Sequence, residues 1–150
     1  DLPPTLLRTL SAAPLHYSPK AKRLVLGFVH RVEHSLLQSI EHITGLRPEP
    51  CFVTPTEFEE QMDRLTTVQD YEEAVIDNPG SAAQMARTLG GFAVEVSARE
   101  ASFAKCNSWI WARLTGKRGT VDLLFSLKNM AVAPRPRLST AFSELTANLG

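Results

Sequence analysis

The stretch ASFAKCNSWIWARLTGKRGTVDLLFSL, residues 101–127, contains three apolar runs separated by two turn signals. Each run is short and contains several of the aromatic and β-branched residues that favour strands. Asn107-Ser108 and the glycines of Gly116-Lys117-Arg118-Gly119 are typical of tight turns between strands. The stretch therefore predicts a three-stranded antiparallel meander, with strands at residues 101–106, 109–114 and 121–127.

One helix is predicted before this meander in the sequence and another after it. Ser81 can cap a helix in which Met85, Ala86 and Leu89 lie on one face, although Gly90-Gly91 leaves its end open. After a proline-containing loop, apolar residues recur at helical spacing and predict a C-terminal amphipathic helix. These apolar residues are Leu138, Phe142, Leu145 and Leu149.

The first 65 residues predict a different set of elements. A short helix follows Pro3-Pro4, and two strands follow it at 15–18 and 23–29. Apolar residues from Val29 and Val32 through Ile43 then recur at helical spacing and predict a long amphipathic helix that Gly45 ends. Residues 47–53 contain two prolines, which favours a strand at the edge of a sheet. Thr54-Pro55, with Glu57 three residues after Thr54, predicts the capped start of a helix that runs to about Leu65.

Residues 66–80 are polar and acidic and end in Asn78-Pro79-Gly80, which indicates a linker. We therefore expect an α+β fold with two subdomains joined by this segment. A mixed sheet with helices spans 1–65, an acidic linker spans 66–80, a helix and β-meander span 81–128, and a loop and helix span 129–150.

Composition describes an ordinary globular chain of 150 residues with zero net charge and 43% hydrophobic residues. Zero net charge gives no general preference for nucleic acid or anionic membrane, and no apolar run approaches the ~20 residues of a membrane-spanning helix. Acidic residues gather in 57–77 and basic residues in 99–137. This distribution would suit two solvated faces, a surface that steers a partner, or an attraction that holds two subdomains together. Cys51 and Cys106 form no CxxC motif, so free thiols in the reducing cytoplasm are expected.

His30, Glu33 and His34 match the H-x-x-E-H zinc pattern. On a helix the two histidines would lie on one face, with the glutamate available as a base. The apolar positions of the predicted helix place them on its solvent side, however, and no third ligand follows. We therefore expect a polar helix surface and no metal site.

Thr115-Gly116-Lys117 resembles the end of a phosphate-binding Walker A loop. That loop needs a glycine where this chain has Trp111, and a hydroxyl residue where it has Arg118. The segment is better interpreted as a hairpin turn.

Trp109 and Trp111 alternate with Ile110 and Ala112, so both indoles would lie on one face of a strand. They would either pack in the core or form, together with Arg113, a partly exposed anchor for a protein partner. Stacking on nucleic acid is the least favoured interpretation, and we expect no nucleic-acid partner.

Several motifs of residues 1–65 resemble the N-terminal domain of protein E, the ATPase family of type II secretion and type IV pilus systems. The similarity rests on the strand at Arg23–Phe28, the helix ending in Thr44-Gly45, Pro48-Glu49-Pro50, and the helix start at Thr54–Glu57. Residues 85–125 more faintly resemble the second N-terminal domain of that family. There the hairpin aspartate is replaced by Thr115, and the segments that bind cyclic di-GMP in some members are absent.

This resemblance implies a cytoplasmic, non-enzymatic assembly domain without catalytic residues or a cofactor. Its partners would be secretion or pilus platform proteins, or a motor domain in the same parent chain. A small-ligand or nucleotide-sensing regulatory domain is the alternative, because such domains accompany motors and the basic segment from Lys105 to Arg118 could accept an anion.

Overall fold

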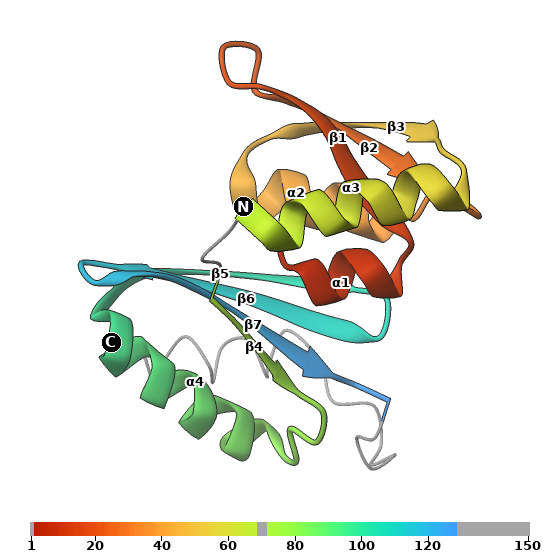
Figure 1. The fold of residues 1–150 in the computed structure, drawn as a ribbon. Coiled ribbons are helices and arrows are strands. Elements are labelled where there is room, and N and C mark those ends of the chain that lie inside the picture. The colour runs from red at the N-terminus through yellow and green to blue at the C-terminus, as the bar shows by residue number, and fades with distance from the viewer. Residues whose placement is uncertain (1, 69–71, 129–150) are drawn as a thin grey trace. The chain divides into compact units, whose positions relative to one another are not determined.

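The computed structural model describes residues 2–68 and 72–128 (Figure 1). The chain divides into two compact units, Asp1–Tyr71 and Glu72–Gly150. Helices accompany a three-stranded sheet in the first unit and a four-stranded sheet in the second. The predicted α+β class is thereby confirmed. The predicted C-terminal loop and helix, at 129–150, lie outside the described residues.

The first unit has a small mixed sheet in the order β1-β2-β3. Strand β1 pairs with β2 in antiparallel fashion, whereas β3 runs parallel to β2 after the crossover helix α2. In chain order the elements are α1 (Pro4–Thr9), β1 (Ala12–Ser18), β2 (Arg23–Phe28), α2 (His34–Thr44), β3 (Arg47–Phe52) and α3 (Pro55–Val68).

The core of the first unit is built on the alternating residues Leu24, Leu26 and Phe28 of β2, which are all buried. Alternation along a strand directs these three side chains to one face of the sheet. Helix α2 contacts β3, while α3 contacts both β1 and α1. The apolar faces of the helices supply the remaining buried side chains, among them Leu36, Ile40 and Met62.

Two local signals in this unit act as predicted. The Thr54 side chain accepts a hydrogen bond from the Glu57 backbone N–H at 3.2 Å, and the Glu57 carboxylate accepts one from the Thr54 N–H at 2.8 Å. This reciprocal pair is a capping box, which satisfies two backbone donors at the start of α3. Gly45 ends α2 in the left-handed conformation, at φ 72°.

Helix α2 is shorter than the sequence pattern predicts. It begins at His34, with Glu33 as the extended residue before it, and not near Val29. The Val29 N–H donates to the Ser11 carbonyl at 3.2 Å, continuing the β1–β2 pairing beyond Phe28. Val29 and Val32 lie at positions that continue the helical spacing of the apolar residues in α2, although both residues precede the helix.

The second unit is a mixed sheet in the order β4-β7-β6-β5, with α4 on one face (Figure 1). Strands β5, β6 and β7 form the predicted antiparallel meander, and β4 adds a fourth strand parallel to β7. The elements are β4 (Glu73–Ile76), α4 (Ala82–Val96), β5 (Ala98–Cys106), β6 (Trp109–Gly116) and β7 (Gly119–Ser126).

The predicted acidic linker at 66–80 is therefore wrong in part. Helix α3 continues to Val68, and Glu73–Ile76 is the strand β4. Ala74 and Ile76 pack against the core under α4, while Val75 lies on the opposite face of the sheet. These apolar side chains stabilise β4 as an edge strand despite the acidic residues around it.

Helix α4 covers the face of the sheet that carries Ile110, Ala112 and Leu114 of β6 and the alternate residues of β7. Its N-terminus has a capping box in which the Ser81 side chain and the Gln84 side chain each bond the other's backbone N–H. The helix continues through Gly90-Gly91, the point at which its predicted end was open. Burial of Met85 and Leu89 stabilises the helix across these two glycines.

Gly116, at the end of β6, lies close against the backbone of Val96 and Ser97. A Cβ at this position would lie 2.3 Å from the carbonyl oxygens of both Val96 and Ser97. The Arg118 N–H donates to the same Val96 carbonyl at 3.1 Å, so the hairpin turn is joined to the end of α4. Gly91, by contrast, would place a Cβ in open space.

We expect Gly116→Ala to lower the free energy of unfolding by about 2 kcal/mol, because backbone atoms must move to accept the new methyl group. Gly91→Ala, in the same unit, should raise it by about 0.5–1 kcal/mol through the better helix propensity of alanine. Urea unfolding of both variants measures the two changes. Equal effects of the two substitutions would contradict the close approach at Gly116.

Candidate interaction surface

The sheet of the second unit has a face opposite α4 that contains both tryptophans of the chain. Cross-strand pairs share a face, and Trp111 pairs with Ala104 of β5 and Leu124 of β7. We call this surface the tryptophan face. Its residues are Val75 of β4; Ser102, Ala104 and Cys106 of β5; Trp109, Trp111 and Arg113 of β6; and Asp122, Leu124 and Ser126 of β7.

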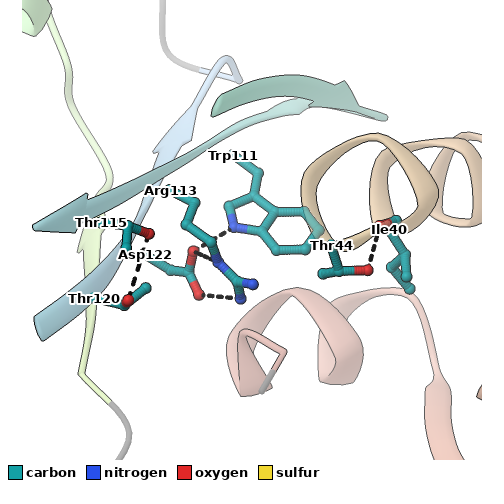
Figure 2. A network of polar contacts seen from close by, with 7 residues as sticks. All are labelled: Ile40, Thr44, Trp111, Arg113, Thr115, Thr120 and Asp122. Atoms are coloured by element: carbon teal, nitrogen blue, oxygen red, sulfur yellow. Dashed lines mark hydrogen bonds and ion pairs between the residues drawn. The ribbon is translucent and has the colours of Figure 1, made fainter. Parts of the chain in front are cut away.

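A polar network lies in the middle of this face (Figure 2). Asp122 accepts a hydrogen bond from the indole N–H of Trp111 at 2.8 Å. Its two carboxylate oxygens also accept one bond each from Nε and Nη2 of Arg113, both at 2.9 Å. The guanidinium carbon of Arg113 lies 5.4 Å from the centre of the Trp111 ring, close enough for a cation–π contact.

Because the network is buried, the charges of Asp122 and Arg113 depend on each other, and not on water, for stabilisation. The Asp122 side chain is fully buried, and that of Arg113 is 15% exposed. Burial raises the pKa of the Asp122 carboxyl and lowers the pKa of the Arg113 guanidinium, because both ions lose water. The three donated hydrogen bonds act in the opposite direction on Asp122, since they favour its ionised form.

Trp109 has no comparable partner. Its indole N–H is buried and finds no hydrogen-bond acceptor in residues 2–68 and 72–128. The neighbouring Cys106 is fully buried and forms no disulfide, as predicted. Cys51, on β3, also forms no disulfide and is only partly buried.

The structure thus brings the three predicted partner-binding residues, Trp109, Trp111 and Arg113, onto one face. Trp111 is fully buried and Trp109 is 7% exposed, which agrees with the core-packing interpretation. Binding of a partner by these residues stays a prediction. Asp122 was missed as the residue that joins Arg113 to Trp111, although the hairpin around residues 116–119 places position 122 directly opposite position 113.

His30, Glu33 and His34 do not share a helix face, because only His34 is helical. His30 and His34 are exposed, and the Glu33 carboxylate accepts a hydrogen bond from Arg31 Nε at 2.7 Å. Among the residues described in the structure, no three histidine, cysteine, aspartate or glutamate side chains are grouped as metal ligands.

The Walker-like segment forms the predicted hairpin turn. Gly116 pairs with Gly119, and the exposed Lys117 and Arg118 form the two-residue connection between β6 and β7. Gly119 has φ 135°, a conformation open to glycine but rarely adopted by other residues.

A pocket of about 530 Å³ lies between the β4–α4 loop and the first turns of α4. Arg87 supplies a cationic side chain, and Asn78, Gln84 and Thr88 supply polar groups. Its size falls within the range of small-molecule sites, ~300–1,000 Å³. None of the residues that line the pocket belongs to the basic segment from Lys105 to Arg118, which the sequence indicated for an anion.

Among residues 2–68, Phe52 is the most exposed large aromatic residue, at 68%. It is the last residue of β3, which lies at the edge of its sheet. Pro48 and Pro50 lack backbone N–H groups, so this edge is poorly suited to adding another strand. A partner at this edge would instead contact side chains.

Comparisons of the chain with models of protein families, with curated proteins and with solved structures give no match. In the described part of the chain, every helix is too short or too polar to cross a membrane.

We expect Asp122→Asn to lower the free energy of unfolding by about 3–5 kcal/mol, because it leaves the buried Arg113 without a counter-charge. The double variant Asp122→Asn, Arg113→Met removes both charges while the asparagine oxygen can still accept from Trp111. It should recover at least half of that loss. Chemical denaturation of the single and double variants tests the coupling. A single variant within about 1 kcal/mol of the unmodified chain would contradict a buried ion pair.

Proposed function

We propose that the chain is a non-enzymatic assembly domain that binds a platform protein of a type II secretion or type IV pilus system. The observation that carries the proposal is the order of elements in the first unit. A strand at Arg23–Phe28 leads to a helix ending at Thr44-Gly45, then to an edge strand and to a helix capped by Thr54. These are the elements that the resemblance to protein E implies for residues 1–65.

One further feature of the first unit supports a binding role. Phe52 exposes an aromatic ring on a strand whose own backbone is protected by prolines. Exposed aromatic side chains on a rigid element are suited to anchor a protein partner. The buried pair of Arg113 and Asp122 in the second unit is, by contrast, paired internally, so we assign it to the fold of that unit and not to binding.

A small-ligand sensor is the second candidate, and the pocket beside Arg87 favours it. ATP or a cyclic dinucleotide at 100 times its dissociation constant would stabilise the chain by ~2.7 kcal/mol. Calorimetry and thermal melting, compared between the unmodified chain and Arg87→Ala, would reveal such a site. Binding that Arg87→Ala abolishes would favour the sensor.

The assembly proposal predicts that the full chain binds the cytoplasmic domain of an inner-membrane platform protein from its own secretion or pilus system. Phe52→Ser should weaken this binding at least tenfold, which corresponds to ~1.4 kcal/mol. Because Phe52 is largely exposed, the substitution should change the free energy of unfolding by no more than about 0.5 kcal/mol. Surface plasmon resonance with the immobilised platform domain measures the affinity.

Val94→Ser is the matched control, since Val94 is 76% exposed but lies on α4 of the second unit. It should leave the affinity unchanged. Absence of binding by the unmodified chain would remove the assembly proposal. Binding that both variants retain would assign the interaction to a different surface from the β3 edge.

A further inference from the structure

Positive charge is concentrated at the end of the β1–β2 hairpin in the first unit. Lys20 and Lys22 lie in the turn between the two strands, Arg23 is the first residue of β2, and Arg47 is the first residue of β3. The register pairs Arg23 with Arg47, so these two side chains share one face of the sheet beside the turn. All four residues are exposed, and we call them the basic hairpin end.

Little negative charge compensates the basic hairpin end. Residues 2–32 of the sequence contain no acidic residue. Glu49 forms an ion pair with Arg23 at 2.6 Å, but the other three members form no ion pair with any residue that the structure describes. Exposed acidic residues gather instead on α3, at Glu57, Glu59, Glu60 and Asp63. This separation of charge within the unit would orient it toward an anionic surface.

Backbone hydrogen bonds fix the turn from two sides. The Lys22 N–H donates to the Pro19 carbonyl at 3.3 Å, which closes the turn. The Lys22 carbonyl accepts from the Arg47 N–H at 2.7 Å, which joins the turn to the start of β3. In Figure 1 the β1–β2 turn extends beyond the helices of the first unit. The cations are therefore held on an ordered backbone, so little conformational entropy is lost when they meet a partner.

An exposed tyrosine adjoins these charges. Tyr17 is 54% exposed and lies opposite Leu24, so its side chain is on the other face of the hairpin from Arg23. Tyrosine is enriched where a membrane meets water, because its ring is apolar and its hydroxyl is polar. Nucleic acid fits this site less well, because single strands are bound by several aromatic rings along a positive groove, whereas the basic hairpin end is a projecting turn with one ring.

We propose that the basic hairpin end binds the anionic headgroups of a phospholipid bilayer and that Tyr17 enters the headgroup layer. Each basic residue near an anionic bilayer raises partitioning about fivefold, and this attraction decays over ~8 Å at physiological salt. A few such residues give a reversible contact and not a permanent anchor. The inference is independent of the assembly proposal, because it rests only on the charge and exposure of this hairpin.

Co-sedimentation of the full chain with phospholipid vesicles tests the proposal. At low salt the chain should sediment with vesicles of phosphatidylcholine that contain about one-third phosphatidylglycerol, and not with pure phosphatidylcholine. Salt at about 1 M should release it, because the Debye length then falls to ~3 Å. The double variant Lys20→Gln, Lys22→Gln should lower the partition constant about thirtyfold. Tyr17→Ser should lower it severalfold.

The matched control is Lys117→Gln, Arg118→Gln, which removes two exposed cations from the β6–β7 turn of the second unit. It should leave the partition constant unchanged, and circular dichroism verifies that each variant is folded. Equal losses in the two double variants would overturn the proposal, because the attraction would then follow the charge of the whole chain.

Two other outcomes also contradict a membrane contact at this hairpin. One is failure of the unmodified chain to sediment with the anionic vesicles at millimolar lipid. The other is binding to a labelled DNA duplex, lost in Lys20→Gln, Lys22→Gln, without binding to vesicles, which would assign the site to nucleic acid. Because the vesicles contain no platform protein, this result and that of the platform-binding experiment can fail separately.

Discussion

The register of β6 against β7 is the constraint on which the second unit depends. Gly116 and Gly119 close the hairpin with two residues between them, so every pair of opposite positions follows from the turn. The register places Arg113 opposite Asp122 and Trp111 opposite Leu124 on one face, and Ala112 opposite Leu123 under α4 on the other. A slip of one residue would exchange the faces of a whole strand and bring a buried charge into the core under α4.

The buried ion pair makes such a slip especially unfavourable. Asp122 accepts three hydrogen bonds from two side chains, and both of those side chains belong to β6. In any other register, a carboxylate or a guanidinium would be buried without its partner, which costs several kcal/mol. We infer that the pair contributes more to the choice of register than to the net free energy of folding, since desolvation offsets much of its Coulomb attraction.

Local signals in the sequence were sufficient for much of this fold. The capping residues Thr54 and Ser81, the helix stop at Gly45 and the turn at Gly116 through Gly119 all act within a few residues, and the structure contains each of them. The start of α2 was wrong because Val29 and Val32 imitate helical periodicity while Val29 still pairs with β1. The spacing of apolar residues alone does not distinguish residues that are buried beside a strand from residues that are buried on one face of a helix.

Strand β4 could not be found in the same way, because it depends on contacts that are distant in the sequence. Four residues in acidic surroundings carry too little alternation to indicate a strand, and their partner, β7, begins more than forty residues later. Asp122 is a different case. Hairpin symmetry about Lys117-Arg118 predicts its pairing with Arg113, and an aspartate within a run of apolar strand residues already implies a cation beside it. The tryptophan face was therefore within reach of the sequence, provided that the turn was used to set the register before the side chains were interpreted.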